Sequence, residues 1–187
     1  MSAIVTLSGG RVLLRQWRDK DRDAFASMNA DARVMEFFRG RLTRAESDAM
    51  ADGIEQHFSK HGFGLWAIEV PGEAPFVGFT GLAIQQFNAH FTPCVEVGWR
   101  LAFEHWGRGY VTEAARLALG YGFGTAKLSE VVSYTSVTNH RSRAVMERLG
   151  MRRNPADDFD YPSLPQGHPL RPHVLYRLGA TAFSATA

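Results

Sequence analysis

The stretch CVEVGWRLAFEHWGRGYVTEAARLALGYGF, residues 94–123, decides the fold of this chain. It contains Gly107-Arg108-Gly109 between a run that alternates like a strand and a run with helical spacing. A glycine turn at such a junction frees backbone N–H groups at the start of a helix, and these groups can bind phosphate. We therefore expect an anion site at residues 107–109, with the rest of the chain as scaffold and substrate wall.

Length and composition predict one domain. The chain has 187 residues and 45% hydrophobic content, which is enough for one core and too little for two. A single cysteine, Cys94, excludes an internal disulfide framework and is typical of a reducing compartment. No apolar run is long enough to cross a bilayer, and the N-terminus lacks a signal-peptide pattern. We expect a cytoplasmic protein without membrane contact, frayed at residues 1–10 and 180–187.

The charge balance does not indicate a polymeric partner. The net charge is +2, and the basic residues are mixed with acidic ones along the chain. A nucleic-acid-binding protein usually carries a concentrated basic patch, so we expect no nucleic-acid partner. An anionic small molecule is compatible with this composition, because its site needs only a few positive groups.

Regular segments fill the first half of the chain. Thr43 and Glu46 form a capping-box pattern, which predicts a helix that begins there and extends to about Lys60. Pro71-Gly72 lies between two strand-like runs and predicts a hairpin. The expected strands cover residues 11–17, 65–70 and 76–84, and the expected helices cover 19–29, 32–38 and 43–60.

The second half predicts an order of strand, helix, strand and helix. Apolar residues alternate with polar or small ones from Cys94 to Leu101, which is the pattern of a strand with one apolar face. Gly98 inside this strand predicts a bulge or a close approach by another backbone. Helices are expected at 111–123 and 139–149, and strands at 130–137 and 173–178. This order predicts an α+β or α/β layered fold.

Taken alone, the glycine turn has several explanations. A dinucleotide-binding fold requires a third glycine where Thr112 stands, and a phosphate loop requires a Gly-Lys-Ser/Thr ending that is absent. A tight turn that binds nothing is the simplest alternative, and an isolated G-x-G pattern cannot exclude it. The neighbouring motifs therefore have to decide between these explanations.

Several separated motifs together resemble the acetyl-CoA-binding core of the GCN5-related N-acetyltransferases (GNAT), in particular their RimJ/RimL-like branch. The matching runs are EVGWRL (96–101), HWGRGYVTEA (105–114) and TNHRSRAVMERLGM (138–151), with further similarity in RVLLRQW (11–17), MEFF (35–38), GFGLWAIE (62–69) and VGFTGL (77–82). The resemblance implies an α+β fold with a mixed, mostly antiparallel central sheet of about seven strands, flanking helices and two splayed central strands. It also implies that residues 1–187 form a single N-acetyltransferase domain.

The resemblance assigns acetyl-CoA, as co-substrate, to the glycine turn and its surroundings. Pantetheine would pair with the strand backbone at Leu101 and Phe103, as an added strand does. The loop from Glu104 to Tyr110 would wrap the pyrophosphate with its N–H groups. Glu104 departs from the family pattern, so its side chain is not expected to bind phosphate. The implied cofactor-binding residues are Leu101, Ala102, Phe103, Trp106, Gly107, Arg108, Gly109, Tyr110, Val111, Thr112, Asn139 and Ser142.

Three of these residues keep a second interpretation. Arg108 either adds positive charge near a phosphate or is an ordinary solvated surface arginine. Asn139 can hydrogen-bond the pantetheine arm, cap the following helix, or do both. Ser142 is either part of the site or merely a residue of the first helical turn.

The implied mechanism is direct attack by an amine on the thioester, which needs a base and an acid. Glu96 is the candidate base, acting through water, on the face of its strand opposite Val97; a solvated or ion-paired carboxylate is the alternative. Ser142 is the candidate acid for the leaving thiolate, because Met146 stands where many relatives have a tyrosine. The reserves are Glu69 and Glu36 for the base and Tyr134 and Tyr110 for the acid.

Two further segments are expected to shape the acceptor pocket. Phe37, Phe38 and Trp66 would supply apolar walls, and the loop at 155–173, rich in Pro, Asp and Gly, would supply acids that attract a cationic amine. His168 and His173 lie near these acids, but their spacing matches no standard metal site, so no metal is expected.

The sequence therefore predicts transfer of an acetyl group from acetyl-CoA to a primary amine, either a protein N-terminus or a small molecule. A catalytically weak acyl-CoA-binding module is the alternative, since the usual tyrosine is missing. A monomer and a homodimer are both compatible with the sequence.

Overall fold

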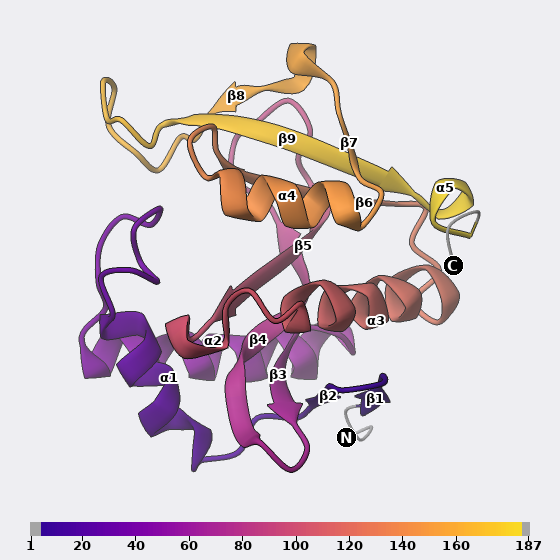
Figure 1. Cartoon of the computed structure of the whole chain (residues 1–187). Helices are drawn as coiled ribbons and strands as arrows, with labels where there is room; N and C mark the ends of the chain where they lie inside the picture. Colours follow the sequence, from indigo (N-terminus) through magenta and orange to yellow (C-terminus); the bar gives the residue numbers. More distant parts are fainter. Residues whose placement is uncertain (1–4, 185–187) are drawn as a thin grey trace.

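A twisted sheet crosses the molecule from end to end (Figure 1), and the computed structural model describes it over residues 5–184. Nine strands are found in this described part, in the order β1-β2-β3-β4-β5-β6-β9-β7, with β8 paired to β9. The strands are β1 (Leu7–Ser8), β2 (Leu13–Arg15), β3 (Leu65–Val70), β4 (Ala74–Gln85), β5 (Cys94–Leu101), β6 (Glu130–Ser136), β7 (Arg152–Arg153), β8 (Phe159–Asp160) and β9 (Pro172–Gly179). The predicted α+β fold is confirmed, with two more strands than expected.

The junction between β5 and β6 is the irregular place in the sheet. All other neighbouring strands are antiparallel, whereas β5 and β6 are parallel and pair only through Glu96 and Val132. Beyond that pair the two strands diverge. The predicted splay of the central strands is therefore confirmed, and it leaves one edge of β5 without a strand partner toward Leu101.

Helices cover both faces of the sheet. They are α1 (Asp21–Ala30), α2 (Arg44–His61), α3 (Tyr110–Gly124), α4 (His140–Arg148) and α5 (Ala180–Ser184). In Figure 1, α3 and α4 lie in front of the sheet and α2 lies behind it. Within residues 5–184, no helix has the length and apolar character needed to cross a bilayer.

The predicted capping box determines where α2 begins. The Thr43 N–H donates to Oε2 of Glu46 at 2.7 Å, and the Glu46 N–H donates to Oγ1 of Thr43 at 3.3 Å. Two N–H groups that lack partners at a helix start are thereby satisfied. Ile54 and Phe58 then follow on the buried face, as their spacing predicts.

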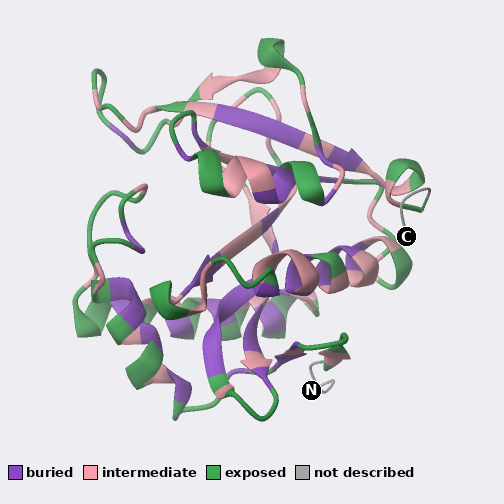
Figure 2. Ribbon diagram, viewed as in Figure 1, coloured by how far each residue is buried: buried purple, intermediate pink, exposed green. Residues whose placement is uncertain are grey.

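The core has one part on each side of β5 (Figure 2). Helix α3 presents small, fully buried residues to both parts, Ala114 and Ala118 to one and Ala115 to the other, which let the helix lie close against the sheet. Leu119 of the same helix is also fully buried, and burial of such a side chain stabilises a fold by about 1.5–3 kcal/mol. The position of α3 is therefore fixed by its apolar face.

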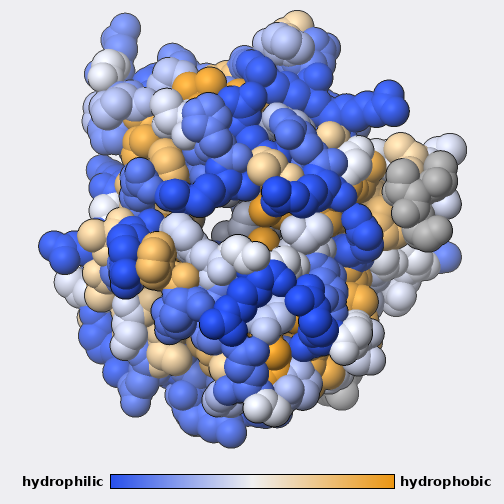
Figure 3. Space-filling view, in the orientation of Figure 1, coloured by the Kyte–Doolittle hydropathy of each residue, from blue (hydrophilic) through white to orange (hydrophobic). Residues whose placement is uncertain are grey.

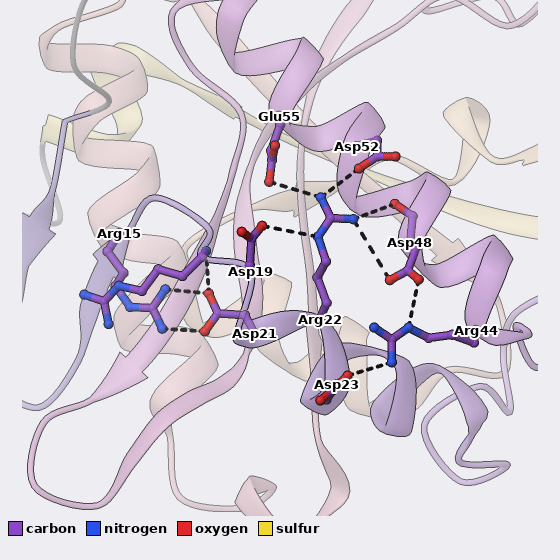
Figure 4. A network of polar contacts seen from close by, with 10 residues as sticks. Arg15, Asp19, Asp21, Arg22, Asp23, Arg44, Asp48, Asp52 and Glu55 are labelled. Atoms are coloured by element: carbon purple, nitrogen blue, oxygen red, sulfur yellow. Dashed lines mark hydrogen bonds and ion pairs between the residues drawn. The ribbon is translucent and has the colours of Figure 1, made fainter.

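Ion pairs hold α1 against α2 at the surface (Figure 4). Arg22 contacts Asp52 at 2.7 Å, and Arg44 contacts Asp23 at 2.6 Å and Asp48 at 2.8 Å. These pairs are largely exposed, and each such pair is worth roughly 0.2–1 kcal/mol. The network therefore orients the two helices more than it stabilises them.

The predicted helix at residues 32–38 is wrong. The segment consists of turns, with separate bonds from the Met35 N–H to the Asp31 carbonyl and from the Phe38 N–H to the Met35 carbonyl. Asp31 is extended (ψ 118°), and its carboxylate accepts from the Arg33 N–H at 2.9 Å. This local bond competes with helical pairing at the start of the segment.

Residues near both ends, where fraying is expected, form regular structure in the part that the structure describes. Leu7 and Ser8 pair with Leu14 and Leu13, so β1 adds an edge strand. At the other end α5 is helical, and the Phe183 ring packs 5.1 Å from that of Phe123. Residues 1–4 and 185–187 lie outside the described part.

Gly98 does not form the predicted bulge. It pairs with Gly81 in an unbroken register between β4 and β5. No other backbone approaches it either, because the nearest atom to a Cβ added there is Oε1 of Glu96 at 3.7 Å. The absent side chain instead leaves space on the face of β5 that Glu96 shares.

Candidate active site

A cavity of about 1540 Å³ occupies the divergence between β5 and β6. Figure 3 shows a hollow at the centre of this face of the molecule, between the part that carries α4 and the part that carries α3. The lining comes from β5, β6, α3, α4, the loop before α3, residues 9–11 and four residues of the 33–38 segment. Sites for single drug-sized ligands usually measure about 300–1,000 Å³, so this cavity has room for a long ligand and a second molecule.

The glycine loop forms one end of the cavity. Gly107 and Gly109 have left-handed φ angles of 74° and 82°, which side chains at these positions would strain. The helix α3 follows at once, and its first intrahelical bond joins the Glu113 N–H to the Gly109 carbonyl. The N–H groups of residues 110–112 therefore have no intrahelical partner, and these residues line the cavity. The loop has the geometry of an anion site.

Side chains around the loop are fixed by Glu73. Its carboxylate forms an ion pair with Arg108 and accepts from the Tyr110 hydroxyl at 2.7 Å. Arg108 is half-exposed, pairs with Glu73 and lines the cavity, so its contact with a phosphate stays a prediction. Glu104 is exposed and lies outside the lining, as its departure from the family pattern predicts.

The free edge of β5 forms the next part of the wall. The Ala102 N–H donates to the Val77 carbonyl, so by strand alternation the backbone groups of Leu101 point away from β4. The Leu101 carbonyl accepts from Nε1 of Trp106 at 2.9 Å. The Leu101 carbonyl therefore already has one partner, and the Ala102 N–H faces the neighbouring strand.

Phe103 also lies outside the cavity lining. Its ring packs beside Trp106, with centroids 5.1 Å apart, and the Arg33 guanidinium lies over it at 3.8 Å. These contacts turn the side chain toward the outer rim of the loop. Among the predicted cofactor residues, Ala102 and Phe103 are the two that do not face the cavity.

Asn139 caps α4 beside the cavity. Its Oδ1 accepts from the Ser142 N–H at 3.2 Å, while its Nδ2 donates to Oγ1 of Thr135 and to Oγ of Ser142. The capping role predicted for Asn139 is confirmed, and both N–H groups of its amide are used, while Oδ1 keeps a second lone pair. Because the Ser142 oxygen accepts from Asn139, its own proton remains available for another acceptor.

Glu96 lies on the floor of the cavity and is half-buried. Gln85 donates to its carboxylate at 2.7 Å. Burial raises the pKa of Glu96 to about 7, and hydrogen bonds from Tyr134 and Gln85 oppose part of that rise. A carboxylate that titrates near neutral pH is suited to accept and release protons. Within residues 5–184 Glu96 has no ion pair, and its role as the base stays a prediction.

Comparison with known proteins identifies this arrangement. Residues 11–152 match the family model of the acetyltransferase (GNAT) domain. The chain belongs to the GNAT family. It is therefore an acyltransferase, and enzymes of this family take their acetyl group from acetyl-CoA.

Relatives of known sequence and structure cover nearly the same length. The uncharacterized protein YkkB of Bacillus subtilis is 29% identical over 152 residues, which are 81% of this chain and 87% of YkkB. A GNAT acetyltransferase from Bacillus anthracis superposes with a TM-score of 0.77 at 25% identity, covering 95% of this chain and 99% of the other. Mycobacterium smegmatis RimJ in complex with CoA-disulfide has a TM-score of 0.74 at 21% identity, covering 98% and 95%.

Tyr134 connects the GNAT cavity to an aromatic cluster behind it. Its ring lies within 6.1 Å of those of Phe87, Phe91, Phe159 and Tyr161. Burial and the nearby Glu96 carboxyl raise the pKa of Tyr134 above its ordinary value, so the hydroxyl stays protonated. The cluster therefore positions a hydrogen-bond donor beside Glu96.

The expected role of the 155–173 loop as an acceptor wall is wrong, because none of its residues lines the cavity. It packs against the cluster through Phe159 and Tyr161 instead. Its acids are not available to an amine, because each one pairs with an arginine. The pairs are Asp157 with Arg177, Asp158 with Arg153, and Asp160 with Arg171.

The predicted acceptor residues separate into two groups. Phe37 and Phe38 line the cavity as expected. Trp66 does not: it is fully buried in β3, its Nε1 donates to the Val5 carbonyl at 2.9 Å, and its ring packs against those of Phe58 and Tyr121. The assignment of Trp66 to the pocket is wrong, because both faces of β3 are covered.

The reserve candidates for the base are engaged elsewhere. Glu69 accepts from Nε of Arg15 at 2.6 Å, and Glu36 pairs with Arg141 at the cavity mouth. Arg141 also lies over the Trp106 ring at 4.7 Å, which links α4 to the glycine loop. Neither carboxylate is placed like that of Glu96, below the gap between the strands.

The structure adds residues that sequence reasoning missed. Gln85 and Arg100 are the main ones, and both face the same side of the sheet as Glu96. The alternation of β5 placed Arg100 beside Glu96 and Gly98 on that face, and this signal could have been used. Gln85 gave no local signal, since its contact depends on the register of β4 with β5.

Metal ligation has no support within residues 5–184, where no three His, Cys, Asp or Glu side chains form a cluster suited to an ion. His168 accepts from the Leu170 N–H through Nδ1, and the His173 ring stacks on Tyr161. Both histidines therefore have local structural roles.

Proposed function

We propose that this GNAT protein transfers the acetyl group of acetyl-CoA to a primary amine by direct attack in a ternary complex. The observation that carries the proposal is a single cavity that joins the N–H groups of the glycine loop to the buried carboxyl of Glu96. A phosphate site at one end and a proton acceptor at the other suit a long anionic donor and an amine.

Acetyl-CoA would enter with its pyrophosphate on residues 107–112. The positive end of the α3 dipole adds to the attraction of the N–H groups there. The pantetheine arm would follow the free edge of β5, where the Leu101 N–H points into the gap. This places the thioester near the point where β5 and β6 diverge. A RimJ/RimL-like branch is consistent with this arrangement, and the likeness to RimJ supports the fold part of that assignment.

Glu96 would be the general base. The amine arrives as an ammonium ion at neutral pH and must lose a proton before it can attack the thioester carbon. Glu96, through a water molecule, accepts that proton, because its pKa of about 7 lets it be ionised and basic at the same pH. The C–N bond then forms as the tetrahedral intermediate appears, and backbone N–H groups near Leu101 would stabilise its oxyanion.

Ser142 would protonate the departing thiolate. When the intermediate collapses, the C–S bond breaks and the sulfur takes the electron pair. The Ser142 hydroxyl has its proton free, because Asn139 donates to the Ser142 oxygen. Solvent then restores the serine proton, and the products are the amide and CoA with its thiol.

A catalytically weak acyl-CoA-binding module is the second candidate, favoured by Met146, which is buried and has no acidic proton. The test is to measure CoA affinity by calorimetry and acetyl-CoA consumption with a broad panel of amines and N-terminal peptides. The enzyme proposal expects CoA binding and turnover with at least one class of amine. Binding without turnover across the whole panel would favour the binding module instead.

A further inference from the structure

Arg100 is a buried cation at the cavity wall. Its residue is 8% exposed, and it lines the cavity from β5. One nitrogen, Nη1, donates to Oδ1 of Asn29 at 2.5 Å, while the buried Nε has no partner. Within residues 5–184 no carboxylate lies within ion-pair distance of it. Burial lowers the pKa of Arg100 to about 10, which still leaves it charged at neutral pH.

The other buried arginine of the described residues, Arg15, has carboxylate partners. Arg15 is 3% exposed, and its guanidinium meets Asp21 at 2.7 Å and Glu69 at 2.6 Å. Figure 4 shows the guanidinium of Arg15 directed at the Asp21 carboxylate. Removing a charge from water without a counter-ion is costly, and Arg15 offsets that cost with two carboxylates. For Arg100 the described residues supply an amide, the sulfur of Met50 and aromatic rings, and no carboxylate.

Aromatic faces cover the guanidinium without neutralising it. The Phe38 ring lies 4.1 Å and the Phe79 ring 5.5 Å from the Arg100 Cζ. Phe38 is 40% exposed and, like Arg100, lines the cavity, so ring and cation lie side by side at the cavity wall. A planar guanidinium held by stacking presents its remaining N–H groups in a fork that matches a carboxylate.

The position of Arg100 separates it from the phosphate site. Arg100 pairs with Phe79 across β4 and β5, on the face covered by α1. Val97 lies on the other face, packed with Ala115 of α3. Because the start of α3 holds the proposed phosphate site, the CoA phosphates belong to that other face. An anion that reaches Arg100 therefore belongs to the acceptor.

We propose that the acceptor carries a carboxylate that pairs with Arg100 while its amine lies near Glu96. This inference rests on the proposed acetyl transfer and adds the chemical class of the acceptor. Four residues of extended strand separate the two side chains, which is roughly 13 Å between their Cα atoms. The carboxylate is then several bonds from the amine, so an ω-amino acid or a peptide with an acidic side chain suits the site.

The experiment compares amines that differ only in charge. The rate constant kcat/KM is measured for ω-amino acids of three to seven carbons and for their neutral carboxamides, each at saturating acetyl-CoA. The variants are Arg100→Gln, Arg100→Lys and, as a matched control, Arg44→Gln on the exposed side of α2. Thermal melting and CoA affinity report whether each variant is folded and keeps the phosphate site.

For the unchanged protein, we expect kcat/KM for the ω-amino acid to exceed kcat/KM for its carboxamide by about tenfold or more at the best chain length. The reason is that only the acid forms a charge-assisted pair with Arg100. Arg100→Gln should bring the ratio close to one, with CoA affinity unchanged, and Arg44→Gln should leave the ratio alone. Arg100→Lys keeps the charge without the fork, so it should give an intermediate ratio. If Arg100→Gln does not fold, the test uses Arg100→Lys, and a ratio equal to that of the unchanged protein would contradict the proposal.

The outcomes separate the two proposals. If amines are acetylated but acid and amide react equally at every length, the carboxylate proposal is wrong and acetyl transfer stands. If no amine reacts, the proposal of acetyl transfer is wrong. Binding of glutarate to the CoA-loaded protein then tests separately whether Arg100 forms an anion site. Glutarate binding that is lost in Arg100→Gln supports the anion site, and its absence in the unchanged protein overturns it.

Discussion

Gln85 donates a hydrogen bond of 2.7 Å from its Nε2 to Oε2 of Glu96, across the ladder between β4 and β5. The bond fixes the carboxyl on the cavity floor and favours its ionised form. Burial acts in the opposite direction and is the larger effect, so the pKa of Glu96 is about 7. The balance of these two effects leads to several of the following predictions.

Replacing Tyr134 with phenylalanine should shift the pH dependence of catalysis. The hydroxyl bond to Glu96 lowers the pKa of that carboxyl, so its removal should raise the pKa further. The midpoint of the kcat/KM profile should therefore move to higher pH, with the plateau largely kept. If Tyr134 were the acid for the thiolate, the plateau itself would fall by about 10²–10⁴-fold, so the same profile distinguishes the two roles.

Glu96→Gln should stabilise the protein in a pH-dependent way. In the folded state the pKa of Glu96 is about 7, above its ordinary value of 4.5, so the stability from this group is full below 4.5 and is lost as pH rises through 7. A neutral glutamine does not suffer that loss. The variant should gain about 1–3 kcal/mol in free energy of unfolding well above pH 7 and nothing at acidic pH.

Urea unfolding of both proteins across this pH range measures the effect. The exposed carboxylate Glu104 provides the control variant, Glu104→Gln, which should show no such trend. A stability difference for Glu96→Gln that is the same at every pH would show that the buried carboxyl is not the cause.

Gly107→Glu should weaken CoA binding by about tenfold or more, because it strains a left-handed residue and adds a negative charge beside the proposed pyrophosphate site. Gly167→Glu is the matched control. Its φ of 80° is equally left-handed, the space around it is equally open, and it lies in the loop away from the cavity. Calorimetric titration with CoA should separate the two variants. Equal affinities would remove the glycine loop from the site.

Ser142→Ala should lower kcat by roughly 10- to 100-fold if the serine protonates the thiolate, while CoA affinity changes little. The Asn139 bond to the Ser142 N–H survives the change, so the helix cap is kept. Ser59→Ala on α2 removes a hydroxyl far from the cavity and controls for general effects. An unchanged kcat would exclude Ser142 as the acid.

Local patterns predicted the parts of the fold that local physics determines. The capping box at Thr43, the alternation of β5 and the glycine turn before α3 each depend on neighbours in sequence, and the structure confirms all three. The segment at 32–38 was misread because its apolar residues suggested a helix, whereas the Asp31 side chain stabilises a turn at its start.

Long-range packing determined what the sequence could not predict. Trp66 is a large aromatic residue of the kind that often lines pockets. It is buried instead, because its ring packs against those of Phe58 and Tyr121, which are 8 and 55 positions away in the sequence. From the sequence, the acids at 157–160 could attract a cationic amine. In the structure each of them pairs with an arginine that is distant in the sequence or lies across the loop. For Glu96, the strand face was predictable, but its burial and its bond to Gln85 depend on the sheet register.

The pH dependence of kcat/KM for Glu96→Gln tests the account most directly. For the unchanged protein, the value should rise about tenfold per pH unit at acidic pH and level near pH 7. Glu96→Gln should be slower by about 10²–10⁴-fold and should lack that inflection, with CoA affinity intact. A variant that keeps both the rate and the inflection of the unchanged protein would contradict the role of Glu96 as the base.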